Sequence, residues 1–402
     1  MPPPTVRKPT NLLQLEEPAN TNGGAPNLKA FLELGFRPLY LGGIAWALVA
    51  IAVWIYAPMA LTGPLQGIAW HAHEMLWGFI ATIAVGFLMT AGSNWTGINP
   101  LHGRALGAVG LLWLVARVGY LVNSEAAFWM AAVCELGFFL AAAVAMMRAV
   151  YVSKNTRNYA VPWLLVGLGL GDGLYLLAAR GGDYGVLMQR FNAALVVMAL
   201  IALLIGRRVI PFFAMRAVPG LDISKHTTSG QVQLGACTVA ALWLLLGWSM
   251  LGAVALATAG ILALVQVLSW KPLAVRHNPL LWILYVGYAG IGTGLLAAAL
   301  LNAGVGLPRV LPVHLIAMAG FSVLIIGMVT RTALGHLGRA LATDASMRAS
   351  YWLMLLAVAL RLAAIAVPGA TAPILHAAGA AWIAALALYL WRFAPMLIRP
   401  RL

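Results

Sequence analysis

The stretch Trp70-His71-Ala72-His73-Glu74-Met75-Leu76-Trp77-Gly78-Phe79 decides how the chain is read, because it places two imidazoles and a carboxylate at the start of an apolar run. That run, Met75 to Thr90, is long enough with its flanks to cross a lipid bilayer as a helix. Ionisable side chains are costly at such a place and mark a functional site. The stretch therefore predicts a membrane helix with a candidate site at its N-terminal end.

The spacing of the three ionisable side chains predicts their directions. Residues two apart on a regular α-helix point about 200° from one another, so His71 and His73 are not expected to share a metal ion from an unbroken helix. His71 and Glu74, three apart, are expected to face the same way. One histidine would be an axial or metal ligand and the other a second ligand or hydrogen-bond partner, and a frayed first turn would bring both together. The alternative is two interfacial histidines in contact with water and headgroups.

Composition excludes an ordinary soluble protein. The 402 residues are 62% hydrophobic and 9% charged, whereas about a quarter of the residues in a soluble domain are charged. The formal net charge of +15 would suggest a nucleic-acid partner in a soluble protein. Here the loops of a membrane protein explain the cations, and no nucleic acid is expected.

Hydropathy predicts an all-α, polytopic membrane bundle of about twelve transmembrane helices. The expected spans lie near residues 40–58, 74–94, 105–122, 128–150, 160–179, 190–206, 234–250, 252–270, 280–302, 310–330, 351–368 and 374–392. Residues 31–396 then form the transmembrane domain. They are flanked by a disordered cytoplasmic tail at 1–30, rich in Pro, Asn, Thr and Glu, and a short cytoplasmic tail at 397–402.

The distribution of Lys and Arg predicts the orientation. Of the 25 Lys and Arg residues, twenty fall on the side of the N-terminus and three (Arg180, Arg190 and Arg309) on the other, while Arg117 and Arg361 lie within spans. This bias predicts that both termini are cytoplasmic.

This topology divides the histidines into two sets. His71, His73, His314 and His376 fall at the outer ends of spans, and His102, His226, His277 and His336 fall in or beside inner loops. Met318, four residues after His314, shares its helix face, which suits a soft metal or a haem edge, although methionine at that spacing also serves simple packing.

Ionisable residues inside spans also gather in the outer half of the bundle. Arg117, Glu135 and Asp172 lie at similar depths, and Arg361 lies near the middle of its span. Arg117 and Glu135 are the predicted ion pair, with a structural role, a role in holding haem propionates, or a role in a proton path. Glu74, Glu135 and Asp172 are the acidic groups placed to carry protons.

Several chemistries find no support in the sequence. Cys134 and Cys237 lie at different depths, and neither belongs to a Cys-x-x-Cys-His motif, so any haem would be held non-covalently. No phosphate-binding Gly-rich loop or serine nucleophile elbow occurs. A reductase of the haem-copper oxidase type would need a His-Pro-Glu-Val-like stretch and an adjacent His-His pair, and neither is present.

Five further stretches, read with His71 to Met75, carry a family resemblance. They are Gly35-Phe36-Arg37-Pro38, Asn94-Trp95-Thr96-Gly97, Gly206-Arg207-Arg208-Val209-Ile210-Pro211-Phe212-Phe213, Gly327-Met328-Val329-Thr330-Arg331 and Gly335-His336-Leu337-Gly338-Arg339. In this order, over residues 31 to 392, the chain resembles the NnrS family of bacterial inner-membrane proteins. The resemblance implies twelve spans, bound haem b and copper, and a part in nitric oxide metabolism, beside denitrification or nitrosative stress.

The resemblance also implies site positions, which this chain matches at His71, His73, Glu74, His314, His336, Arg117 and Arg361. Glu135 stands where an Asp is expected, and His376 has no counterpart. We expect His73 and His314 to bind haem, Arg117 and Arg361 to hold it, His71, His73 and His314 to supply metal ligands, and Glu74 and Glu135 to act catalytically. Which histidine takes iron and which takes copper stays open.

The expected function is therefore that of a haem and copper protein in the inner membrane that binds or turns over nitric oxide, with its metal site towards the periplasm. A nitric oxide reductase would also need an electron donor, either quinol or a periplasmic redox protein. The alternative is a secondary transporter of a metal ion or small anion, bound by His71, Glu74 and His314.

Overall fold

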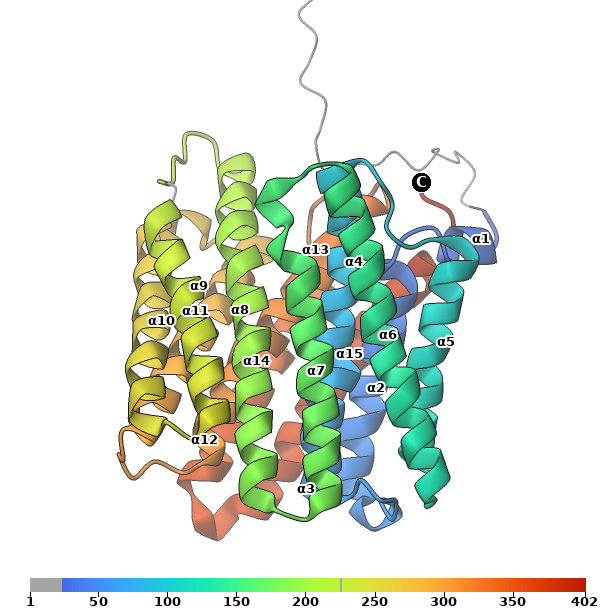
Figure 1. Cartoon of the computed structure of the whole chain (residues 1–402). Coiled ribbons are helices and arrows are strands. Elements are labelled where there is room, and N and C mark those ends of the chain that lie inside the picture. Colours follow the sequence, from blue (N-terminus) through green and yellow to red (C-terminus); the bar gives the residue numbers. More distant parts are fainter. Residues whose placement is uncertain (1–23, 225) are drawn as a thin grey trace, which may run out of the picture.

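The structure is a computed structural model that describes residues 24–402 except 225, and no strand occurs among these residues. Long helices pack side by side into one bundle (Figure 1). Its long helical stretches are α2 (Phe36–Tyr56), Gly67–Thr96, α5 (Gly103–Gly119), α6 (Glu125–Val152), α7 (Ala160–Gly181), α8 (Tyr184–Ala217), α9 (Thr227–Leu246), α10 (Ser249–Ser269), α11 (Pro279–Asn302), Val310–His336, α14 (Ala345–Ala366) and α15 (Thr371–Leu397).

The prediction of an all-α membrane bundle is confirmed. Within the described residues, eleven of these stretches are long and apolar enough to cross a membrane. The twelfth, α5, has 17 residues, which gives about 25 Å of helix against a hydrocarbon core of about 30 Å.

Both ends of the described chain lie at the same end of the bundle (Figure 1). The short helix α1 (Leu28–Phe31) is capped by the Asn27 side chain, and the Asn27 N–H donates a hydrogen bond of 2.9 Å to the carbonyl of Ile398. Arg37, buried at the start of α2, donates to the carbonyls of Leu397 and Arg399. Residues 1–23, which make up most of the expected N-terminal tail, lie outside the described residues.

Two of the membrane stretches contain a π-helical segment directly after a histidine. The first stretch is α3 (Gly67–His73), η2 (Glu74–Ala81) and α4 (Thr82–Thr96), and the second is α12 (Val310–His314), η5 (Leu315–Ser322) and α13 (Val323–His336). The hydroxyl groups of Thr82 and Ser322 each donate to a carbonyl five residues earlier, at 3.0 and 2.8 Å. A polar side chain thus satisfies a carbonyl in each widened turn, and such turns are frequent at functional sites.

Close packing holds these two stretches in place. η2 and η5 contact each other, and α11 packs along η5. A Cβ added at Gly290 in α11 would meet the backbone of Ala319, and one added at Gly287 would lie 2.5 Å from the backbone nitrogen of Leu324. Only glycine allows this approach of two backbones, which fixes the depth and rotation of the helix that carries His314. Both α3 and α12 lie at the end of the bundle away from the C-terminus (Figure 1).

Candidate functional site

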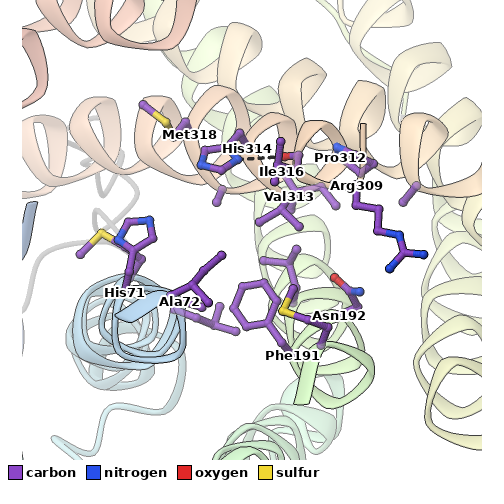
Figure 2. A pocket seen from close by; sticks show the side chains of 18 of the residues that line it. His71, Ala72, Phe191, Asn192, Arg309, Pro312, Val313, His314, Ile316 and Met318 are labelled. Carbon is purple, nitrogen blue, oxygen red and sulfur yellow. Dashed lines mark hydrogen bonds between the residues drawn. The ribbon is translucent and has the colours of Figure 1, made fainter. Parts of the chain in front are cut away.

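A cavity of about 680 Å³ lies at the end of the bundle that holds α3 and α12. Its wall is mostly apolar, and polar groups on several helices line it. They include His71, Asn192, Arg309 and His314 (Figure 2), together with Gln189 and Arg361. Pre-formed cofactor sites in proteins are apolar hollows of roughly 300–1,000 Å³ with a few convergent polar groups. The cavity therefore has the size and lining of a site for an organic cofactor.

The ring of His314 is oriented by its own helix. Its Nδ1 lies 2.8 Å from the carbonyl oxygen of Val310 (Figure 2). A carbonyl can only accept a hydrogen bond, so Nδ1 is the protonated nitrogen and, in the neutral ring, Nε2 keeps its lone pair. A backbone carbonyl behind the ring in this way is the usual arrangement of a metal-ligating histidine.

The ring of His71 is oriented by stacking. It lies flat on the indole of Trp54 in α2, with ring centroids 4.9 Å apart and planes inclined by 8°. Its Nδ1 is buried and has no hydrogen-bond partner among the described residues, although most buried polar side-chain atoms have one. Arg361 lines the same cavity as His71 and His314. An unpartnered ring nitrogen in an apolar wall is suited to bind an iron or copper ion.

The remaining lining adds sulfur and positive charge. Met75, Met188 and Met318 contribute thioethers, and Arg309 and Arg361 contribute guanidinium groups, while no carboxylate from the described chain lines the cavity. Guanidinium groups bind carboxylates in bidentate geometry. The residues present therefore fit a haem, with imidazole for the iron, apolar walls for the ring and cations for the two propionates.

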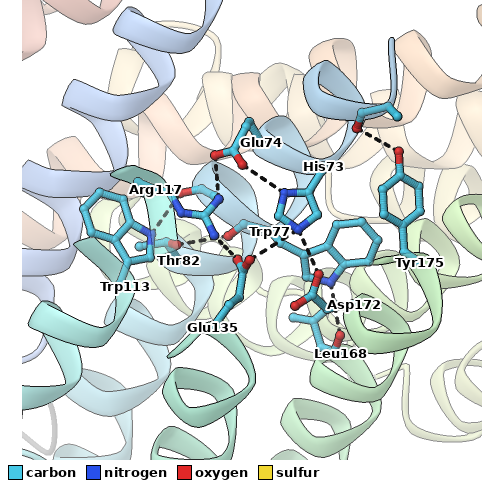
Figure 3. A network of polar contacts seen from close by, with 12 residues as sticks. His73, Glu74, Trp77, Thr82, Trp113, Arg117, Glu135, Leu168, Asp172 and Tyr175 are labelled. Carbon is cyan, nitrogen blue, oxygen red and sulfur yellow. Dashed lines mark hydrogen bonds and ion pairs between the residues drawn. The ribbon is translucent and has the colours of Figure 1, made fainter. Parts of the chain in front are cut away.

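A second polar centre forms around His73, which is fully buried. Its Nδ1 lies 2.9 Å from Oε1 of Glu74, and its Nε2 lies 2.9 Å from Oδ1 of Asp172 and 3.2 Å from Oε2 of Glu135 (Figure 3). These carboxylates come from η2, α7 and α6, and each is at most 1% exposed. One imidazole thus joins three helices inside the bundle.

Arg117 of α5 completes this His73 centre. Its guanidinium lies 2.5 Å from Oε2 of Glu74 and also pairs with Glu135 (Figure 3). The predicted ion pair between Arg117 and Glu135 is therefore confirmed, with Glu74 as a third member. The indole nitrogen of Trp46 donates to the same Glu74 oxygen at 2.5 Å. Arg117 is thus held by carboxylates and, unlike Arg361, does not line the cavity.

The charges of the His73 centre do not balance. Three carboxylates face one guanidinium, so an excess of negative charge remains even when His73 is protonated. Uncompensated charge inside a membrane bundle is costly, so the centre needs a further proton or a bound cation. Ligand atoms of His73, Glu135 and Asp172 lie within 4.8 Å of one another, and these nitrogen and oxygen donors are suited to a metal ion.

The structure places His71 and His73 in different surroundings, as their spacing on an unbroken helix predicts, and it is His71 rather than His73 that lies with His314. His71 and His314 line one cavity, whereas His73 does not line it and lies among carboxylates. Glu74, which directly follows α3, contacts His73. His376 is exposed and donates from Nδ1 to the carbonyl of Ala372 at 2.9 Å.

Sequence reasoning also missed three contributors. The sequence identifies Arg309 only as a loop cation, although it lines the cavity, and gives no sign that Trp54 stacks on His71. Asp172 was identified as a proton carrier but not as a partner of His73. Aromatic stacking and convergence between distant helices leave no local sequence signal.

Gly78 of η2 makes room for the His73 centre, so its replacement is expected to disrupt it. A Cβ at this position would lie 2.5 Å from the guanidinium of Arg117 and 2.6 Å from Oε2 of Glu74. Gly78→Ala is expected to lower stability by about 1–3 kcal/mol, the usual effect of overpacking, measured by thermal unfolding in detergent. Gly110→Ala is the control, since no described atom beyond its chain neighbours and its own helix backbone lies within 4 Å of its Cβ position. An equal loss in both variants would contradict this role.

A known protein family matches nearly the whole helical bundle. The family model described as NnrS protein matches residues 30–401, which includes both histidine sites. A comparison with curated proteins gave no match.

Proposed function

Because the chain belongs to the NnrS family, we propose that it is a haem protein of the bacterial inner membrane that binds or turns over nitric oxide. Its role would be in nitrosative-stress defence or denitrification. The observation that supports this most is the apolar cavity, into which two helices bring His71 and His314 with a ring nitrogen available on each.

In this proposal the cavity holds haem b. His71 and His314 would hold the iron, and Arg309 and Arg361 would hold the propionates. Haem iron supplies a coordination position for a diatomic ligand when one axial position is open or labile. Nitric oxide is small and uncharged, so an apolar cavity within the membrane is accessible to it without a polar channel.

We place copper at the His73 centre because the spacing of its donor atoms suits a single ion. A cavity of about 680 Å³ is far larger than a bare ion requires, whereas the donors of His73, Glu135 and Asp172 lie within 4.8 Å of one another. Imidazole binds copper readily, and carboxylate oxygen completes N,O sets for Cu(II). A divalent cation would also offset the excess negative charge of the three carboxylates.

The same centre is placed to supply protons. Reduction of nitric oxide consumes protons as well as electrons, and Glu74 and Glu135 would carry them, with Asp172 as a further acceptor. Since His71 and His73 are two residues apart on α3, the carboxylate centre adjoins the helix that lines the cavity. Electrons would come from quinol or a periplasmic redox protein, and the positive-inside distribution of cations favours a cavity towards the periplasm.

Anaerobic spectroscopy of the purified protein tests this proposal. We expect a Soret band that shifts when nitric oxide is added, and iron and copper in the same sample by elemental analysis. A nitric oxide electrode with a quinol donor then separates binding from turnover. Protein that is folded, free of haem when purified from haem-replete cells, and unable to take up added haemin would contradict the proposal.

Secondary transport of a metal ion or small anion is the second candidate, and the paired π-helical segments favour it. η2 and η5 contact each other and interrupt two stretches that are far apart in the sequence, as interrupted helices do at the binding sites of many transporters. Uptake of Cu²⁺ or nitrite by proteoliposomes made with haem-free protein would support transport. An absence of uptake above that of empty liposomes would exclude it for these solutes.

A further inference from the structure

A second cavity, of about 630 Å³, lies at the opposite end of the bundle, and the proposed function gives it no role. It is formed by the last turns of α4, α8 and α13 and by the loop before α7. It shares no lining residue with the first cavity. This end of the bundle also holds the two ends of the described chain (Figure 1).

Positive charge dominates the second cavity. Four arginines line it, Arg157, Arg208, Arg216 and Arg331, and His336 lies beside them, while no carboxylate of the described residues contributes to the wall. Among those residues, none of the four guanidinium groups forms an ion pair. Four uncompensated cations around one hollow create a strong local field for anions.

Among the four arginines, Arg331 gives the strongest indication of a bound anion. It is 7% exposed, and within the described chain its guanidinium forms no hydrogen bond; the ring of Phe213 lies beneath it at 3.9 Å. The positive-inside distribution accounts for cations in loops, but it does not require a buried guanidinium that faces a cavity. A buried charge is retained when partners compensate for it. Among the described residues the Phe213 ring does so in part, and no carboxylate pairs with the guanidinium.

The rest of the lining, together with the number of positive charges, indicates which kind of anion the cavity would bind. Phe87, Trp95, Phe212 and Phe213 supply aromatic surface, and the Asn158 side chain accepts a hydrogen bond of 2.9 Å from Arg208. A single carboxylate would leave most of the four positive charges uncompensated. A phosphate group offers more charge and several acceptor oxygens, and arginine binds it in bidentate geometry. Basic pockets between helices on the cytoplasmic side suit phosphate headgroups of lipids.

From this geometry we propose that the second cavity is a binding site for a phosphate-bearing anion, with Arg331 as its buried anchor. The phosphate belongs either to the headgroup of an acidic phospholipid, whose acyl chains follow the apolar wall, or to a soluble phosphate compound. Arg208 and Arg216 of α8 line the same cavity and supply further positive charge.

The test uses the full-length, delipidated protein in detergent, with Arg331→Gln compared with wild type. Native mass spectrometry measures the binding of phosphatidylglycerol against phosphatidylcholine, and thermal unfolding measures stabilisation by inorganic phosphate. Arg148→Gln is the matched control, since Arg148 is exposed near the end of α6 and does not line the cavity.

We expect Arg331→Gln to weaken phosphate-group binding by at least about tenfold, the usual effect of losing a hydrogen bond to a charged group, and Arg148→Gln to bind as wild type does. Selective loss of phosphatidylglycerol identifies the lipid as the source, and selective loss of inorganic phosphate stabilisation identifies a soluble anion. If neither probe binds, or if both variants bind equally, the proposal is wrong. If Arg331→Gln fails to fold, Arg216→Gln replaces it, because Arg216 is exposed; this variant is also expected to weaken phosphate-group binding.

Discussion

His71→Ala and His314→Ala are each expected to abolish or strongly shift the Soret band of the purified protein. Both rings line the cavity proposed for haem, and each offers a ring nitrogen that no other described residue occupies. Loss of a partner behind a metal ligand typically costs about 10–100-fold in affinity, so loss of a ligand itself should cost more. The measurement is the absorbance spectrum with haem quantified per polypeptide.

Two further histidines serve as controls for this prediction. His376→Ala should leave the spectrum unchanged, because His376 is exposed and does not line the cavity. His73→Ala should keep the Soret band but lose bound copper, because His73 belongs to the carboxylate centre. A Soret band lost in His73→Ala and retained in both His71→Ala and His314→Ala would reverse the two assignments.

Arg117→Met is expected to cause the largest loss of stability of any single substitution proposed for this chain. The side chain is fully buried and pairs with both Glu74 and Glu135. Removing one partner of a buried ion pair typically costs about 3–5 kcal/mol, because the remaining charge is left uncompensated. Thermal or denaturant unfolding in detergent measures the effect, and a low yield of folded protein would be its cellular counterpart.

A second variant and a control define the cause of this loss. Arg117→Met combined with Glu135→Gln should recover part of the stability, because it removes one of the excess negative charges. Arg180→Met breaks the ion pair with Glu125, whose side chains are 39% and 52% exposed, and exposed pairs contribute about 0–1 kcal/mol. Equal losses of unfolding free energy in Arg117→Met and Arg180→Met would show that burial does not make the Arg117 ion pairs more stabilising.

The helical membrane bundle was predictable from the sequence because it follows from hydropathy alone. Long apolar runs separated by basic loops leave few alternatives in a bilayer, where every backbone polar group must be bonded within its own segment. The ion pair between Arg117 and Glu135 was predictable from matched depths on neighbouring spans, and the structure confirms it.

The division between His71 and His73 was predictable, because residues two apart on a helix point about 200° from one another and α3 runs unbroken through both. What the spacing could not predict is which of the two lines the cavity with His314. The carboxylate of Glu74 contacts His73 and Arg117, and helix spacing alone does not identify Arg117, on another helix, as its partner. Nothing in the apolar sequence of η2 or η5 signals a wider turn. Their pairing depends on contacts between segments more than 200 residues apart in the chain.

The location of the cofactor tests the account most directly. We propose a cryo-electron microscopy map of the protein purified with its native cofactors. The account predicts porphyrin density in the cavity, with iron bonded to a ring nitrogen of His71, His314 or both, and with propionates at Arg309 and Arg361. Porphyrin at another position, such as beside His336, or acyl chains alone in the cavity would contradict it.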